Sequence, residues 1–317
     1  MTTEFLRRVA QRHAAAVATG ALKCIDLEHT VVEGDGLPFM VQWPSTDVLQ
    51  HETLDAPQAS QASRGPGQRE SPEPEQPEDA KDSGESDSSP FSPPDPELTI
   101  GPVGDHHVAL LNKFPACARH VLLARTEFQE QQSGVNPEDF AAIAMVLSAA
   151  GGLVFYNGGE RAGASQRHKH LQWVSEQDSP VSLRLYTEVF NEELDDLTLV
   201  AHPGLPVRHC FVRVRAGAGV PVHDAAASMH EAYTIVQAHL GLHMNGQGFV
   251  PPFNLLIEDG WMLVVPRRQE CFQDISVNAL SYAGLLHVQR LDQVDAIRQA
   301  GPLAVLATTG YPWHPGD

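Results

Sequence analysis

The stretch YNGGERAGASQRHKHLQWV (residues 156–174) joins a loop rich in glycine, serine and glutamine to an alternating run of polar residues. We expect residues 168–174 to form a strand, in which successive side chains point to opposite faces. A lysine, a leucine and a tryptophan then share one face. The other face carries two imidazoles and one amide in a row, from His168, His170 and Gln172.

Three interpretations of this polar face remain open on the residues alone. Its histidines, two of 16 in the chain, can form hydrogen bonds inside the fold without any further role. They can also bind a metal ion, since H-x-H on a strand is a common ligand pair. Gln172, however, is a poor zinc ligand, and no third ligand stands at a diagnostic spacing. The third interpretation is covalent catalysis, in which a neutral imidazole attacks a phosphoryl group and carries it.

Phosphoryl transfer through a histidine needs hydrogen-bond donors around the phosphate oxygens, because positioning and charge stabilisation supply most of the rate. The loop before the strand fits this need. Gly163 lets the backbone approach a phosphate, and Ser165 and Gln166 add side-chain donors. Gln172 adds one more donor from the strand itself.

The surrounding sequence mixes strand and helix patterns without a regular repeat. We expect strands at 37–43, 107–114, 120–128, 153–157 and 207–214. We expect helices over the first 20 residues and at 136–152, 223–240, 276–290 and 292–300. Asn136 and Pro137 suit a helix start, and Asp259-Gly260 predicts the turn of a hairpin over 253–267. This mixture favours an α+β fold.

The first part of the chain divides into two regions of different composition. Residues 1–48 predict a helix and a strand that pack on the core. Residues 49–90 are rich in proline, serine and acidic residues and are expected to be a disordered insertion. Residues 51–97 hold twelve carboxylates against three cations, a net charge of −9 within the chain's −19. The acidic charge therefore argues against nucleic acid as a partner but leaves a local phosphate pocket possible.

Membrane and secretory signals are missing from the sequence. No apolar run reaches the roughly 18 residues that a membrane span needs. The N-terminus resembles an amphipathic helix more than a signal peptide. Cysteines at positions 24, 117, 210 and 271 lie far apart and predict free thiols without a structural zinc site. We therefore expect a cytoplasmic protein that binds no membrane.

The motif NGG…GASQ-x-H-x-H-L-Q resembles the diadenosine tetraphosphate phosphorylases, also called ATP adenylyltransferases. This family belongs to the histidine-triad superfamily, in the branch that replaces the third histidine by glutamine, as galactose-1-phosphate uridylyltransferases do. The resemblance extends over FSPPDPELTIGP (91–102), HVALLNKFPACARHVLLARTEFQEQ (107–131), NLLIEDGWMLVVPR (254–267) and SVNALSYAGLLHV (276–288). It implies a histidine-triad-like fold with a mainly antiparallel sheet flanked by helices. Residues 91–200 would form the catalytic region, and residues 201–317 would complete the sheet and the nucleotide pocket.

The resemblance also implies roles for individual residues. His170 would be the nucleophile, His168 would orient the site through hydrogen bonds, and Gln172 would contact the phosphate under attack. Further substrate contacts would come from Asn112, Lys113, Asn157, Gly163, Ala164, Ser165, Gln166, Asn254, Met262 and Arg267. A structural role is also open for each of them; Met262, for example, would be a core residue in any hairpin. The family's basic residue for the distal phosphates falls in the insertion, where the candidates are Arg64, Arg69 and Lys81.

The implied reaction is phosphorolysis of diadenosine tetraphosphate to ATP and ADP through a covalent adenylyl-histidine. The partners would be a dinucleoside polyphosphate, inorganic phosphate, ATP and ADP, with Mg²⁺ or another divalent cation carried on the substrate phosphates. No organic cofactor and no protein-bound metal are implied, and the chain would be a monomer or a dimer. A dinucleoside polyphosphate hydrolase, another nucleotidyltransferase on the same site, and a non-catalytic nucleotide sensor are the alternatives. The H-K-H motif disfavours a sugar-nucleotide role, because the uridylyltransferases usually carry H-P-H.

Overall fold

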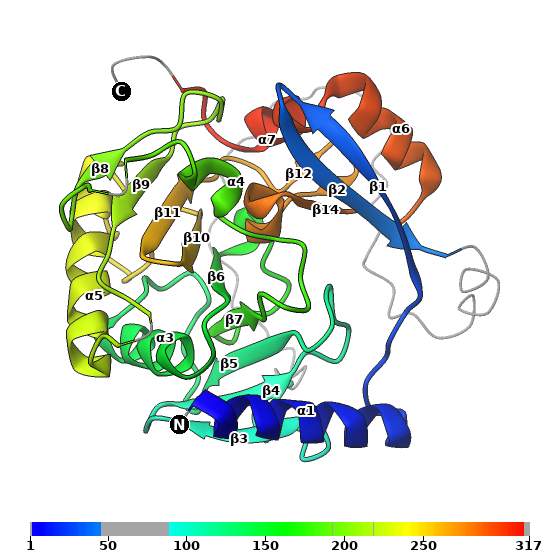
Figure 1. Ribbon diagram of the computed structural model, residues 1–317, viewed down its shortest axis with the longest axis vertical. Helices are drawn as coiled ribbons and strands as arrows, with labels where there is room; N and C mark the ends of the chain where they lie inside the picture. Colours follow the sequence, from blue (N-terminus) through cyan, green and yellow to red (C-terminus); the bar gives the residue numbers. More distant parts are fainter. Residues whose placement is uncertain (1, 46–88, 192, 218, 314–317) are drawn as a thin grey trace, which may run out of the picture.

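The computed structural model describes residues 2–45, 89–191, 193–217 and 219–313. Its centre is a nine-stranded antiparallel sheet with the strand order β3-β4-β5-β7-β6-β10-β11-β9-β8 (Figure 1). The strands of this sheet are β3 (Thr99–Val103), β4 (His107–Leu111), β5 (Val121–Arg125), β6 (Leu153–Gly158), β7 (His170–Val174), β8 (Leu199–Val200), β9 (Cys210–Arg213), β10 (Phe253–Glu258) and β11 (Trp261–Pro266). The predicted α+β fold is confirmed. Residues 49–88 of the expected insertion lie outside the described residues.

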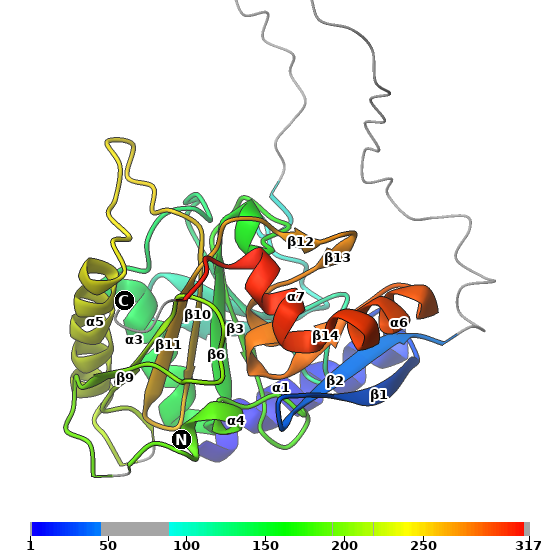
Figure 2. The same cartoon turned by 90° about the horizontal axis from the view of Figure 1, so that it is seen from above.

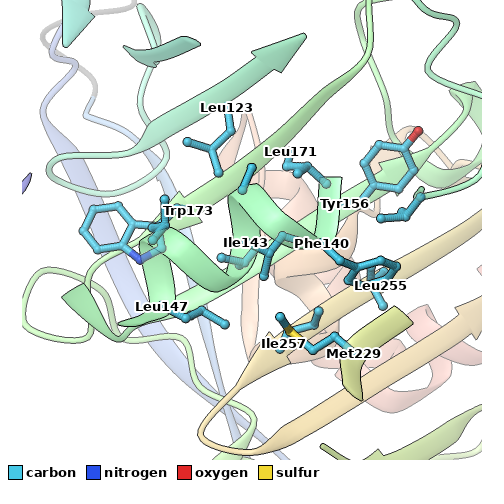
Figure 3. Close-up of a cluster of buried hydrophobic side chains, with 14 of the residues drawn as sticks. Leu123, Phe140, Ile143, Leu147, Tyr156, Leu171, Trp173, Met229, Leu255 and Ile257 are labelled. Carbon is cyan, nitrogen blue, oxygen red and sulfur yellow. The ribbon is translucent and has the colours of Figure 1, made fainter. Parts of the chain in front are cut away.

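Three helices cover one face of this sheet. They are α1 (Thr2–Thr19), α3 (Pro137–Ala150) and α5 (Val222–His239). Figure 3 shows Phe140, Ile143 and Leu147 of α3 among side chains from the sheet, including Leu171 and Trp173. The start of α3 follows the sequence prediction, because the Asn136 side chain accepts a hydrogen bond from the backbone N–H of Asp139 at 3.0 Å and Pro137 opens the helix. Burial of this apolar layer holds the sheet and helices together.

A second apolar layer lies on the opposite face of the sheet (Figure 2). Its elements are β1 (Leu27–Gly34), β2 (Leu37–Pro44), α4 (Arg184–Thr187), the 3₁₀-helix η2 (Ala279–Ala283), β14 (Leu285–His287), α6 (Leu291–Ala300) and α7 (Pro302–Thr309). Strands β1, β2 and β14 form a small sheet in which β14 is parallel to β2. The remaining short elements are η1 (Glu160–Ala162), β12 (Cys271–Phe272) and β13 (Ile275–Ser276).

The predicted hairpin forms as expected. β10 and β11 pair antiparallel from Phe253↔Pro266 to Glu258↔Trp261. Asp259 and Gly260 between them both have positive φ, 49° and 78°. That is the requirement of the tight turn whose twist matches a hairpin.

The predicted helix over 276–290 is wrong. Asn278 caps a single 3₁₀ turn by accepting from the N–H of Leu280, and Gly284 at φ 91° ends it. The chain then continues as β14, which pairs with β2 from the other end of the sequence. A nearly continuous apolar run has no period that separates a buried helix from a buried turn and strand. Strands β1 and β3 and helix α7 were not predicted.

Two further sequence expectations can be compared with the structure. All four cysteines are free thiols, as expected. Among the described residues, no helix combines the length and apolar character that a membrane crossing requires.

Candidate active site

A cavity of about 450 Å³ opens on the face of the sheet opposite to α3 and α5. Its walls come from β4 to β7, the loop after η1, the 112–116 loop and η2. Its apolar lining includes Phe91, Leu98, Leu110 and Leu122, and the ring of Phe91 lies 5.2 Å from that of His170. The cavity also brings together the expected residues Asn157, Gly163, Ala164, Ser165, Gln166, His170 and Gln172. The volume lies within the range of small-molecule sites.

His170 is held with one ring nitrogen toward the cavity. Its Nδ1 lies 2.9 Å from the backbone oxygen of His168. A carbonyl oxygen only accepts, so Nδ1 carries the proton and Nε2 keeps the lone pair. Burial lowers the pKa of His170 to about 4. The ring is therefore neutral at pH 7, which is the state that a nucleophilic imidazole needs.

The backbone around His170 is fixed by Gln131, a residue that the sequence analysis did not identify. The Gln131 side chain accepts from the His170 N–H at 2.8 Å and donates to the His170 carbonyl at 3.1 Å. The same amide donates to the Asn157 carbonyl at 3.0 Å. One buried side chain thus ties the strand that carries His170 to the strand that carries Asn157. It is distant in sequence from both, so no local pattern marks it.

His168 lies behind the cavity wall, with 1 % of its surface exposed. Its Nε2 donates to the Arg125 carbonyl at 2.8 Å, so Nδ1 is an acceptor and takes the Ser89 hydroxyl at 2.5 Å. The rings of Phe91 and Phe128 pack edge-on against it. His168 is not among the residues that line the cavity, and it acts on His170 through its backbone carbonyl. Ser89 is a second residue that sequence reasoning missed.

The amides of Gln172 and Asn157 both have their oxygen engaged by protein donors. Gln172 Oε1 lies 2.9 Å from Nε2 of His120. Asn157 Oδ1 accepts from Asn254 Nδ2 at 2.9 Å and from the Ala279 N–H at 3.0 Å. Within the described residues, neither NH₂ group donates a hydrogen bond to protein. Both amides thus present donors to the cavity that also contains His170 Nε2.

The loop after η1 is shaped around a glycine. Gly163 has φ 89°, and a Cβ built there would lie 2.7 Å from the Cβ of Asn278. Only glycine therefore fits between the loop and the segment that precedes η2. Ser165 and Gln166 are exposed at the mouth of the cavity. The geometry agrees with the expectation that this loop brings backbone and side-chain donors to the edge of the site.

The three expected contacts from the C-terminal hairpin do not line this cavity. Asn254 is fully buried, and its side chain donates a hydrogen bond to Asn157 Oδ1. Arg267 is 1 % exposed; its guanidinium donates to Asn254 Oδ1 at 2.5 Å and to the backbone carbonyls of residues 269, 270, 277 and 309. Met262 is fully buried in the layer under α3 and α5, on the other side of the sheet. The structure therefore places these residues behind the site or away from it.

Basic residues are scarce at the cavity. Asn112 and Lys113 stand at its rim, and Lys113 is the only lysine or arginine among the described residues that line it. Arg161 is exposed and does not line the cavity. Arg64, Arg69 and Lys81 lie outside the described residues. No group of three His, Cys, Asp or Glu side chains is arranged for a metal ion in the described part of the chain.

A buried ionic cluster supports β7 from the helix side. Lys169, between the two histidines, lies 2.5 Å from Asp139 Oδ2 and donates to the Gly134 carbonyl at 2.7 Å. His107 Nε2 lies 3.0 Å from the other carboxylate oxygen. Burial raises the pKa of Asp139, but the His107 hydrogen bond and the Lys169 charge outweigh it and leave the pKa below its usual value. Because side chains alternate along this segment, Lys169 anchors it on the helix side, and His170 and Gln172 lie on the side of the cavity.

Comparison with known proteins gives consistent matches over nearly the whole chain. Residues 1–186 match the Ap4A phosphorylase N-terminal domain, and residues 203–312 match the ATP adenylyltransferase C-terminal domain. Diadenosine 5',5'''-P1,P4-tetraphosphate phosphorylase 2 of Saccharomyces cerevisiae is 27 % identical over 65 % of this chain and 70 % of its own. Protein APA1 of the same yeast is 28 % identical over 69 % of this chain and 75 % of its own.

Solved structures show the same fold. The crystal structure of yeast Ap4A phosphorylase Apa2 in complex with AMP has a TM-score of 0.74 at 22 % identity, covering 99 % of this chain and 98 % of that chain. The structure of Apa2 in complex with Ap4A has a TM-score of 0.70 at 20 % identity, covering 98 % and 99 %. The fold of the described residues is therefore similar to that of Apa2.

Proposed function

Because the chain belongs to the Ap4A phosphorylase family, we propose that it cleaves diadenosine tetraphosphate with inorganic phosphate to give ATP and ADP. The observation that carries the proposal is the geometry around His170. A neutral imidazole keeps its Nε2 lone pair toward a cavity in which two amide groups present donors. This is the arrangement that nucleophilic attack on a phosphoryl group requires.

In the first half-reaction His170 Nε2 attacks the α-phosphorus of the dinucleotide. The bond from phosphorus to the bridging oxygen breaks, ATP leaves, and AMP remains on Nε2. The imidazole becomes cationic, and its Nδ1 proton stays hydrogen-bonded to the His168 carbonyl. That carbonyl stabilises the positive ring as it forms, without a proton having to leave.

In the second half-reaction inorganic phosphate attacks the same phosphorus and expels Nε2. The product is ADP, and His170 returns to its neutral state with the lone pair free. Microscopic reversibility makes the opposite direction, from ATP and ADP to the dinucleotide, available to the same site. The NH₂ groups of Gln172 and Asn157 and the 163–166 loop would bind the phosphate oxygens throughout.

The cavity offers both apolar and polar groups to a nucleotide. Phe91, Leu98, Leu110 and Leu122 would offer apolar contacts to a base, and the amides and the 163–166 loop would receive its phosphates. Lys113, which lines the cavity, would contact the polyphosphate. Asp95 is the only carboxylate among the described lining residues, so a divalent cation such as Mg²⁺ would be bound through the substrate phosphates.

A phosphate-dependence assay tests this function. Purified protein is incubated with diadenosine tetraphosphate and Mg²⁺, with and without inorganic phosphate, beside a His170→Ala control. We expect ATP plus ADP only when phosphate and His170 are both present. ATP plus AMP without phosphate would make the protein a hydrolase on the same site. Nucleotide binding without turnover would make it a sensor, and either result would overturn the phosphorylase proposal.

A further inference from the structure

His120 is a cavity residue to which the sequence motif assigns no role. It immediately precedes β5, is 3 % exposed, and lines the cavity beside Gln172. Its ring also packs against Phe155, with centroids 5.7 Å apart. It belongs neither to the H-x-H-x-Q strand nor to the phosphate loop, so its contribution has to be read from its hydrogen bonds.

The environment of Nδ1 fixes which ring nitrogen of His120 carries the proton. The backbone N–H of Ala116 points at Nδ1 from 3.4 Å, and Asn112 Nδ2 lies 3.3 Å away. Asn112 Oδ1 accepts from the Phe114 N–H at 3.1 Å, which turns its NH₂ toward His120. A backbone N–H can only donate, so Nδ1 is an acceptor and Nε2 carries the proton.

That tautomer decides how the Gln172 amide is turned. The two orientations of a glutamine amide have nearly the same shape and differ in where the oxygen and nitrogen lie. Packing alone therefore does not choose between them. The N–H at His120 Nε2, 2.9 Å from the Gln172 side chain, needs an acceptor and takes Oε1.

We propose that His120 is a positioning residue, which holds the Gln172 amide with its NH₂ group toward the phosphate and its oxygen away from it. The inference rests on the proposed function, because it concerns the phosphate that His170 attacks. A flipped amide would place an oxygen lone pair against a negatively charged phosphate oxygen. It would replace a stabilising donor by a repulsive contact at the atom that gains charge in the transition state.

The chain contains a matched internal control for His120. His209 immediately precedes β9, is also 3 % exposed, and also has its pKa lowered to about 4 by burial, as His120 does. Its hydrogen bonds have the opposite sense. Nδ1 donates to the Val207 carbonyl at 2.6 Å, and Nε2 accepts from the His202 N–H at 2.8 Å. The strand order places β9 beyond β6, β10 and β11 from the strand that carries Gln172.

The first test measures the tautomers without any turnover. Full-length protein labelled with ¹⁵N in histidine is studied by two-bond ¹H–¹⁵N correlation spectra at pH 7, with signals assigned from His120→Gln and His209→Gln. We expect His120 to carry its proton on Nε2 and His209 on Nδ1. A proton on Nδ1 of His120 would overturn the proposal even if the enzyme is active.

The second test is a double-mutant cycle on kcat. His120→Phe keeps the ring shape without the donor, and we expect kcat to fall roughly 10–100-fold, somewhat less than the loss of a whole oxyanion donor. His120→Gln places an amide nitrogen the same number of bonds from Cβ and should restore most of that rate. In a Gln172→Ala background, His120→Phe should change kcat less than threefold, because its partner is absent.

The outcomes separate this inference from the proposed function. Equal losses from His120→Phe in both backgrounds, or a kcat of His120→Phe equal to that of the wild type, would overturn the positioning role while leaving the phosphorylase reaction intact. A wild-type protein with no turnover would overturn the function alone, since the tautomer measurement does not depend on it. His209→Phe is the control for burial, and it should leave kcat unchanged.

Discussion

The two halves of the nine-stranded sheet are built in the same order but contain different chemistry. The first half runs β4, β5, α3, β6 and β7, and the second runs β8, β9, α5, β10 and β11. From the centre outward, the two halves place equivalent strands in the same sequence, β6-β7-β5-β4 and β10-β11-β9-β8, and β3 extends the first half beyond β4. The two helices pack on each other through Phe140 and Tyr233, whose ring centroids are 5.5 Å apart.

Strand register makes this comparison specific. Aligning His120 with His209 makes Leu122 equivalent to Phe211, and these pair with Gln172 and Leu263. By the same alignment His170 is equivalent to Trp261. Trp261 and Leu263 are buried in the apolar layer that fills the second half. The same arrangement of strands thus encloses a cavity in the first half and a packed core in the second. The side chains on one face of β7 and β11 determine this difference.

The second half supports the first rather than supplying contacts of its own to the cavity. Arg267 holds Asn254, and Asn254 holds the Asn157 oxygen so that its NH₂ faces the cavity. This chain of buried polar groups crosses the central β6–β10 pair. The comparison therefore predicts losses of chemistry from changes in the first half and losses of stability from changes in the second.

The largest effect is expected from the pair of equivalent residues His170 and Trp261. His170→Ala removes the attacking nitrogen, and we expect turnover to fall at least ~10⁴-fold with little loss of folding, because a neutral ring is lost from a cavity wall. Trp261→Phe should lower stability and leave kcat within about twofold. For both variants, rapid-quench kinetics measure turnover and urea unfolding measures the free energy of unfolding. A large kcat loss in Trp261→Phe would contradict the prediction that changes in the second half affect stability and not chemistry.

Gln172→Leu makes the first half resemble the second, where Leu263 stands. The change removes one donor to the phosphate under attack, and we expect kcat to fall about 10²–10³-fold, as for an oxyanion-hole donor. Stability should fall by about 1–3 kcal/mol, because the buried Nε2–H of His120 loses its acceptor. Steady-state kinetics beside thermal unfolding check this. A normal kcat would show that Gln172 does not contact the reacting phosphate.

Arg267→Met tests the supporting role of the second half. The substitution removes the guanidinium donor from four backbone carbonyls and from the Asn254 oxygen. The carbonyls of residues 270 and 309 keep backbone N–H donors, and the other three groups lose the donor that Arg267 supplies. At about 1–3 kcal/mol for each buried group, we expect a stability loss of at least ~3 kcal/mol. Urea unfolding measures it, with Arg268→Met as an exposed neighbour that should cost little. A stable Arg267→Met protein whose KM alone rises would instead make Arg267 a substrate contact.

Sequence predicted the parts of the site that lie close together along the chain. The alternation of His168, His170 and Gln172 after the glycine loop fixes their shared side, and the structure gathers the loop and the strand at one cavity. Many of the strand and helix segments, the cap at Asn136 and the Asp259-Gly260 turn were also recognisable from the sequence. These features depend on neighbours within a few residues, where side-chain periodicity and turn chemistry act directly.

The rest depends on contacts between distant segments. Gln131, Ser89 and His120 act through partners 39, 79 and 52 residues away, and no periodicity marks such pairs. Met262 shares its hairpin with Arg267, but the pleat places it on the far face of the sheet. A helix was predicted for residues 276–290 because local sequence does not reveal that part of this segment pairs with β2, near the start of the chain.

The smallest effect concerns the buried histidines of both halves. Burial lowers the pKa of His120, His170 and His209 to about 4, while the unfolded chain titrates near 6.5. Below that value the unfolded state binds more protons, so stability is complete above pH 6.5 and falls as pH drops toward 4. Each group contributes a loss on the order of 2 kcal/mol between pH 7 and pH 5.

The comparison of halves makes this pH effect testable. His209→Phe should lower the free energy of unfolding at pH 7, because the hydrogen bonds of His209 are lost. Between pH 7 and pH 5, however, the free energy of unfolding of this variant should fall by about 2 kcal/mol less than that of the wild type. Urea unfolding at both pH values gives the difference. An unchanged difference would mean that His209 is protonated in the folded state.

The most direct test of the central claim is to isolate the intermediate. The protein is mixed with diadenosine tetraphosphate in the absence of inorganic phosphate, quenched at neutral to alkaline pH, digested and analysed by mass spectrometry. The account predicts one adenylyl group on the peptide that contains His170, its loss as ADP when phosphate is added, and no such adduct in His170→Ala. An adenylyl group on another residue, or release of ATP with no adduct at any time, would contradict it.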